Sequence, residues 1–126
     1  MQVIYLNVNA NKAPEKLNIK DELQNYYNLI ECNSIDIVRR KIGKRYFNII
    51  CDDEGMLVDG PKISAISNLG EVRLVGNLVI CSDMVTKNGD LVGLSDEEAE
   101  YIRQRIEFLY TRKYPQGYYI LTQCEY

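Results

Sequence analysis

Histidine and tryptophan are absent from the 126-residue sequence, and only two phenylalanines and three prolines occur. Without histidine the chain cannot build a Ser-His-Asp triad, a zinc site with imidazole ligands or the usual imidazole acid–base pair. No run of about 18 apolar residues occurs, and the N-terminal residues lack the basic and apolar regions of a secretory signal. We therefore expect a cytoplasmic protein without a membrane-spanning segment.

An excess of basic residues is also missing. The 15 Lys and Arg residues are outnumbered by 18 Asp and Glu residues, which gives a formal net charge of −3. This balance argues against direct nucleic-acid binding, and it is too mild for a protein whose whole surface mimics DNA. Hydrophobic residues make up 46% of the chain and charged residues 26%, as in ordinary globular proteins. At this length we predict a single domain over residues 1–126, with a Tyr-rich C-terminal extension at 110–126.

The four cysteines form no C-x-x-C pair, so the spacing indicates neither a zinc site nor a redox motif. Most of them stand in apolar stretches, such as Ile49-Ile50-Cys51 and Val79-Ile80-Cys81. We predict reduced, buried thiols that pack as small hydrophobic side chains. A cysteine nucleophile would need a base other than histidine. We expect neither a metal nor a cofactor.

Local patterns predict an α+β fold with a mainly antiparallel sheet of about five to six strands and two amphipathic helices. The clearest hairpin joins residues 35–42 to 45–51 through a two-residue Gly43-Lys44 turn, and Asn88-Gly89 marks a second hairpin. Residues 63–67 predict a helical turn or an irregular crossing. Further strands are expected at residues 2–8, 56–58, 74–81, 91–92 and 118–123, with a turn at 59–61.

Two segments carry the apolar spacing of amphipathic helices. Residues 20–30 present a stripe from Leu23 to Ile30, with Asn18 or Asp21 as the candidate N-cap. The second helix starts with a capping box, Ser95 and Glu98. Its predicted buried stripe is Ala99, Ile102, Ile106 and Leu109, and Pro115 and Gly117 are expected to end it.

A combination of segments is the most distinctive feature of the chain. Ile35-Asp36-Ile37-Val38-Arg39-Arg40-Lys41-Ile42-Gly43 is followed by Ile49-Ile50-Cys51-Asp52-Asp53-Glu54-Gly55, then by Ser64-Ala65-Ile66, Leu74-Val75-Gly76-Asn77-Leu78 and Leu94-Ser95-Asp96-Glu97-Glu98. Over roughly residues 1–108 the chain resembles an uncharacterised family of small proteins, a domain of unknown function carried by phages and mobile elements of Gram-positive bacteria. The resemblance implies accessory genes kept near anti-restriction and other anti-defence genes. It assigns no catalytic residues.

Two surface clusters are candidate binding sites. The first is basic and surrounds one hairpin tip, where it is either a solvated sheet edge or a site for phosphate, a nucleotide or an acidic protein surface. Because side chains alternate along a strand, these cations cannot all point at one ligand. Its members are Arg39, Arg40, Lys41, Lys44 and Arg45.

The second cluster is rich in tyrosine. Half of the ten tyrosines stand in residues 110–126, beyond the end of the shorter members of the resembled family. Tyrosine suits both core packing in an added edge strand and a surface for a partner or for self-association. The candidate partner surface is Tyr110, Arg112, Lys113, Tyr114, Tyr118 and Tyr119.

The acidic run Asp52-Asp53-Glu54-Gly55 predicts a turn, and a divalent-cation site is the alternative, although the spacing lacks the calcium-loop pattern. No glycine-rich phosphate loop and no paired carboxylates in a recognisable setting occur. We therefore predict that the protein is not an enzyme. The expected function is inhibition of a host defence protein or nuclease complex through a surface contact, of the anti-CRISPR or another anti-defence type. The alternative is an oligomer that binds or sequesters a nucleotide.

Overall fold

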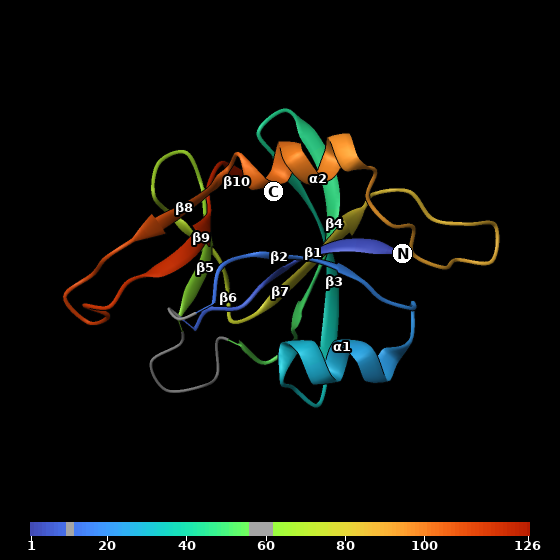
Figure 1. The fold of residues 1–126 in the computed structure, drawn as a ribbon, viewed down its shortest axis with the longest axis horizontal. Helices are drawn as coiled ribbons and strands as arrows, with labels where there is room; N and C mark the ends of the chain where they lie inside the picture. Colours follow the sequence, from blue (N-terminus) through green and yellow to red (C-terminus); the bar gives the residue numbers. More distant parts are fainter. Residues whose placement is uncertain (10–11, 56–61) are drawn as a thin grey trace.

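The computed structural model describes residues 1–9, 12–55 and 62–126, in which two helices and ten strands form two sheets (Figure 1). This arrangement confirms the predicted α+β class. The predicted strand at 56–58 and turn at 59–61 lie outside the described residues. The elements are β1 (Gln2–Leu6), β2 (Glu15–Asn18), α1 (Leu23–Ile30), β3 (Ile35–Ile42), β4 (Arg45–Asp52), β5 (Ile63–Ile66), β6 (Val72–Val75), β7 (Leu78–Ser82), α2 (Asp96–Arg103), β8 (Ile106–Leu109), β9 (Tyr118–Leu121) and β10 (Cys124–Glu125).

The larger sheet has six antiparallel strands in the order β10-β3-β4-β7-β1-β2. Its strands β3 and β4 form the predicted hairpin, in which Ile42 pairs with Arg45 across the Gly43-Lys44 turn. Gly43 has a positive φ of 63°, as a glycine-first two-residue hairpin turn requires. The smaller sheet has the order β6-β5-β9-β8, in which only the β5–β9 pair is parallel. The chain therefore places the β8–β9 hairpin at one end of the smaller sheet.

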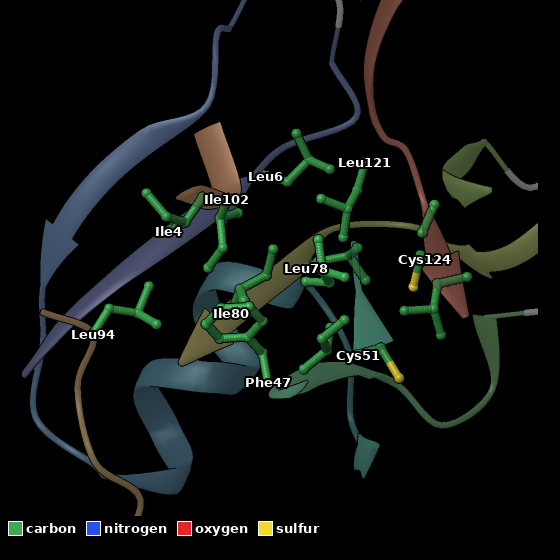
Figure 2. Close-up of a cluster of buried hydrophobic side chains, with 14 of the residues drawn as sticks. Ile4, Leu6, Phe47, Cys51, Leu78, Ile80, Leu94, Ile102, Leu121 and Cys124 are labelled. Atoms are coloured by element: carbon green, nitrogen blue, oxygen red, sulfur yellow. The ribbon is translucent and has the colours of Figure 1, made fainter. Parts of the chain in front are cut away.

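Side-chain alternation divides the core between the two faces of the larger sheet. Along β1, Val3 and Tyr5 pack with α1, whereas Ile4 and Leu6 pack with α2 and the smaller sheet. The two helices accordingly lie on opposite sides of the sheet (Figure 1). Phe47 and Ile102 are fully buried on the α2 side, where side chains from both sheets and α2 meet (Figure 2). Neither helix of the described residues, each eight residues long, has the length to cross a membrane.

Three predictions about strands need correction. The apolar run 74–81 is not one strand, because Gly76, with a φ of 78°, and Asn77 break it into β6 and β7, which join different sheets. Residues 63–67 do not form a helical turn, since they contain the bulged strand β5. The Asn88-Gly89 turn is present, but its hairpin shrinks to a single bridge between Val85 and Leu91.

The predicted helices exist, with corrected ends. The Ser95–Glu98 capping box of α2 is confirmed, but the helix ends at Arg103, far before Pro115 and Gly117. The last two residues of the predicted stripe lie in β8 instead, where they pair with β9. Neither Asn18 nor Asp21 caps α1, because the N-cap is Glu22 and forms no side-chain cap bond. Asp21 instead accepts hydrogen bonds from the Tyr26 hydroxyl and the Leu91 amide, which fasten α1 to the 83–92 loop.

Candidate functional site

The five cations of the first cluster occupy three separate places, as side-chain alternation predicts. Arg39 lies on the α1 side of the larger sheet, where its guanidinium is 3.2 Å from Asp83 and stacks 4.0 Å from the Tyr46 ring centre. Arg40 points to the other side and stacks 4.4 Å from the Tyr126 ring centre. Lys41 is partly buried within β3, and Lys44 and Arg45 stand at the hairpin turn. The cluster is therefore not one site.

Lys44 and Arg45 instead lie beside Tyr101 and Arg105, and together these residues border a hollow that we call the basic groove. This open hollow of about 500 Å³ lies between the hairpin turn and the end of α2, and Gly43 also borders it. Three cations line it, and two side-chain amides form much of the rest of its wall. Its defining residues are Lys44, Arg45, Asn68, Tyr101, Arg105 and Gln123.

Tyr101 holds the basic groove together. Its hydroxyl accepts a hydrogen bond from the Lys44 amide at 2.7 Å, which ties α2 to the hairpin turn. The Arg105 guanidinium stacks 3.5 Å from the Tyr101 ring centre and donates to the Tyr101 carbonyl at 2.8 Å. The Gly43 amide donates to the Gln123 carbonyl on the opposite wall at 3.0 Å. Gln123 adopts a left-handed φ of 60°, which is uncommon for a residue other than glycine.

The charges of the groove are only partly balanced. Arg45 lies 3.9 Å from Glu97 and 3.8 Å from Glu98, distances at which a partly exposed ion pair is weak. In the part of the chain that the structure describes, no carboxylate lies within ion-pair distance of Lys44 or Arg105. The Nε atom of Arg105 is buried and has no hydrogen-bond acceptor there.

The Tyr-rich cluster forms the β8–β9 hairpin, which extends from the body of the protein (Figure 1). Phe108 meets Tyr110 edge-on and Tyr119 at a tilt, with 4.9 Å between ring centres in both pairs. The ring of Phe108 lies against Gly117, where a Cβ atom would come within 2.7 Å of it. We call Phe108, Tyr110 and Tyr119 the aromatic surface. Arg112 and Lys113 are exposed in the loop at its tip.

Two residues of the predicted partner surface turn inward. Tyr118 is only 2% exposed, so it packs inside the fold and cannot contribute to a surface contact. Burial raises its pKa, as expected for a phenol removed from water. Tyr114 is half-buried and meets the Tyr118 ring edge-on at 5.5 Å. The alternation along β9 explains the division, because Tyr118 and Tyr119 point to opposite faces of the smaller sheet.

The family comparison covers most of these features. The model of the domain of unknown function DUF3846 matches residues 1–107. The chain belongs to this family. Searches of curated proteins and of solved structures found no match.

The DUF3846 match includes most of the basic groove and excludes the whole aromatic surface. Lys44, Arg45, Tyr101 and Arg105 fall within residues 1–107, whereas the match ends one residue before Phe108. Residues 108–126 are nevertheless part of the fold, because β9 and β10 pair with strands of the matched segment. Gln123 brings one of the groove walls from this C-terminal part.

The cysteines and the acidic turn of the DUF3846 chain show no sign of a reactive or metal-binding site among the described residues. Cys51, Cys81 and Cys124 are buried, as predicted. Burial raises the pKa of the Cys51 and Cys124 thiols to about 11 and of Cys81 to about 12. Cys32 is only partly buried, although its pKa is also raised by burial. In the acidic turn the Asp52 carboxylate accepts a hydrogen bond from the Glu54 amide at 2.9 Å, which is turn chemistry. No cluster of three or more metal-binding side chains occurs among the described residues.

Several interacting residues carry no sequence signal that would single them out. Tyr101 and Arg105 belong to no motif, and they meet the hairpin turn only because β3 and β4 bring it beneath the end of α2. Arg73 pairs with Glu71 at 3.0 Å and Glu125 at 3.2 Å, and it stacks 4.5 Å from the Tyr126 ring centre. These contacts join residues that are remote in the sequence. Only the run of charges near 44 and 45 was available as a signal.

Proposed function

We propose that this DUF3846 protein is a non-enzymatic accessory protein of a phage or mobile element that binds and inhibits a host defence component in the bacterial cytoplasm. The genetic context is the one that the resemblance noted in the sequence implies, and it is part of the proposal. The observation that carries the proposal is the aromatic surface on a hairpin that extends from the body of the protein. The partner is a defence protein or nuclease complex, and inhibition follows from occupying its surface.

The aromatic surface has the properties of a protein-binding hot spot. Tyr110 is 67% exposed and Phe108 is 36% exposed, although large aromatic side chains gain most by burial. Their mutual ring contacts restrict their rotamers before binding, so less side-chain entropy is lost in a complex. Aromatic residues of this kind supply much of the binding energy in protein interfaces. A complementary apolar pocket on a partner would bury both rings.

The surroundings of the aromatic surface favour an acidic partner. Arg112 and Lys113 are exposed at the hairpin tip, and Arg103 lines a hollow of about 240 Å³ beside Ile106 and Tyr119. Cations around an apolar contact accelerate association with an acidic surface and select against a basic one. Among the described residues β8 is an edge strand of the smaller sheet, and an edge strand can pair with a strand of a partner. These features support a contact made with one face of the hairpin.

Buried thiols support a role without covalent catalysis. A cysteine nucleophile reacts as the thiolate, which a lowered pKa favours. Burial has the opposite effect here, since it raises the pKa of every cysteine in the chain. Binding without turnover is consistent with this chemistry.

The proposal is tested by expressing the protein in bacteria that carry single, defined defence systems, including CRISPR nucleases, and by measuring phage plating. Wild type is expected to raise plating on at least one host by a factor of ten or more, as a stoichiometric inhibitor should. The double variant Phe108→Ser with Tyr110→Ser should lose the effect. Leu69→Ser is the matched control, because Leu69 is 86% exposed in the β5–β6 turn. The purified defence complex should co-elute with wild type and the control only.

Two results would overturn the proposal. One is that no defence system in the panel is relieved at an expression level confirmed by immunoblotting. The other is that the hairpin variant remains as active as Leu69→Ser while both stay folded. If light scattering instead shows an oligomer that the hairpin substitutions dissociate, the aromatic surface is a self-association site and the proposed contact is wrong.

A further inference from the structure

The basic groove continues into a second hollow that shares two of its residues. This neighbouring hollow has about 520 Å³ and is bordered by Asn68 and Gln123 on the shared side, and by Ser67, Glu107 and Thr122 beyond them. Each hollow lies within the range of roughly 300–1,000 Å³ that small-molecule sites occupy. The chain thus carries one extended groove with a basic end at the hairpin turn.

The two ends of the groove differ in charge. Lys44, Arg45 and Arg105 gather at one end, and the single carboxylate of Glu107 lies at the other. Arginine matches the geometry of a phosphate group with paired N–H donors, and lysine adds a mobile positive charge. A carboxylate accepts hydrogen bonds from hydroxyl or amino groups. The charge pattern therefore fits a ligand with an anionic end and a donor-rich end.

The Arg105 guanidinium is held in place before an anion binds. Arg105 is held by the Tyr101 ring and carbonyl, and its buried Nε still lacks an acceptor within the described residues. Lys44 is exposed and makes no ion pair there, although its own amide is fixed to the Tyr101 hydroxyl. Positions that are set in advance reduce the entropy lost on binding.

The middle of the groove offers hydrogen bonds in both directions. Asn68 and Gln123 are exposed, and in the described part of the chain neither side-chain amide has a hydrogen-bond partner of its own. An amide side chain both donates and accepts, as the edge of a nucleobase or a sugar hydroxyl requires. Gln123 is also held in its left-handed conformation, and such backbone strain is concentrated at functional sites.

We propose that the basic groove binds a nucleoside phosphate, with the phosphate at Lys44, Arg45 and Arg105 and the nucleoside along Asn68 and Gln123 toward Glu107. A free small molecule is favoured over a nucleic-acid strand, because three cations in a protein of net charge −3 make a confined positive region. This site is separate from the aromatic surface, so the inhibition assay and the ligand assay fail or succeed independently.

The test is isothermal titration of the full-length protein with AMP, ADP and cyclic AMP, and with adenosine, inorganic phosphate and a short single-stranded DNA as comparison probes. At least one nucleotide should bind, and adenosine should bind much more weakly. Lys44→Glu should weaken nucleotide binding by about ten- to a hundredfold, since a charged hydrogen bond becomes a repulsion. Added salt should weaken binding as well. At a nucleotide concentration of about 100 times Kd, the wild-type Tm should rise by roughly 8 °C.

Lys87→Glu is the matched control, because Lys87 is exposed in the 83–92 loop and the substitution changes the net charge by the same amount. Arg105→Gln is a second variant, checked for folding by its thermal unfolding curve. The proposal is overturned if no nucleotide binds at about 1 mM, or if Lys87→Glu weakens binding as much as Lys44→Glu. Inorganic phosphate binding as tightly as any nucleotide, or tighter binding of the DNA strand, would overturn it too.

Discussion

The close approach of Gly43 to α2 makes a quantitative prediction about Gly43→Ala. A Cβ atom at this position would lie 2.5 Å from both the Arg105 Nε and the Tyr101 hydroxyl, so both side chains must move. Moving them breaks the hydrogen bond from the Lys44 amide and the stacking of the guanidinium on the ring. Alanine must also adopt the positive φ of 63° that glycine accepts without cost.

The two contributions can be separated by a matched glycine. Gly70 also has a positive φ, 78°, but a Cβ atom there would meet nothing within 4 Å. Gly70→Ala should therefore lower the free energy of unfolding by about 1–2 kcal/mol, the cost of the left-handed conformation alone. Gly43→Ala carries the same cost and loses about 1 kcal/mol of hydrogen bonding and roughly 0.5–1 kcal/mol of cation–π contact. Its total should be about 2.5–4 kcal/mol.

Urea titration followed by circular dichroism measures the free energy of unfolding of both variants. Equal m-values show that the variants expose the same amount of surface on unfolding, so their free energies can be compared. In a background of Tyr101→Phe with Arg105→Ala, the cost of Gly43→Ala should fall to that of Gly70→Ala, because the displaced atoms are gone. If the two glycine substitutions cost the same in the wild-type background, the packing of α2 on the hairpin turn is refuted. The basic groove would then lose its structural basis.

Three further changes test the core, the helix start and the buried thiols. Ile102→Ala should lower the free energy of unfolding by roughly 3–4 kcal/mol in urea, since Ile102 is fully buried, and a value below about 1 kcal/mol would contradict its packing. Ser95→Ala removes the acceptor of the Glu98 amide and should cost about 1 kcal/mol in the same titration; no change would show that the cap is not formed. Burial raises the thiol pKa values of Cys51, Cys81 and Cys124 from 9.0 to about 11 or 12, so the stability that these thiols contribute is full below about pH 9 and falls as the pH rises toward 11. The urea midpoint should therefore drop over that pH range. A thiol reagent at pH 8 should label the partly buried Cys32 well before the three buried cysteines. A midpoint that stays flat to pH 11 would contradict the burial of these thiols.

Local chemistry explains which elements could be predicted from the sequence. The hairpin of β3 and β4 depends on a two-residue turn with glycine first, and the start of α2 depends on Ser95 and Glu98. Both signals act within a few residues, so they keep their meaning whatever surrounds them. The two sets of alternating side chains in β1 were predictable for the same reason.

Tertiary pairing explains the elements that were predicted wrongly. Ile106 and Leu109 continue the helical spacing of α2, yet both lie in β8, where they pair with Leu121 and Tyr118 of β9. A strand partner from later in the chain thus overrides the local helical pattern. The run 74–81 is apolar throughout, so hydrophobicity alone does not reveal that Gly76 divides it between two sheets.

The candidate sites show the same contrast between local signals, which the sequence reveals, and tertiary contacts, which it does not. Lys44 and Arg45 could be singled out in the sequence because cations are dense around the hairpin. Their neighbours in the structure, Tyr101 and Arg105, are distant in the sequence. The alternation of β3 sends Arg39 and Arg40 to opposite faces, whereas Lys44 and Arg45 border the same hollow as Arg105. The sequence could predict the separation of the cluster, because the period of a strand is known. It could not predict the partner on α2, because no local pattern encodes that contact.

The C-terminal residues connect the two proposed sites to the family fold. The family match ends at residue 107, yet β10 pairs with β3 directly beside the hairpin turn, and the Gln123 carbonyl accepts the Gly43 amide. The same segment begins with the aromatic surface and ends with a wall of the basic groove. A change in sequence or length beyond residue 107 would therefore alter the aromatic surface and the groove wall. It would leave the three cations of the groove in place, because Lys44, Arg45 and Arg105 all belong to the matched segment. The cationic end of the groove therefore lies wholly within the segment that the family model matches, whereas Gln123 and the aromatic surface lie beyond it.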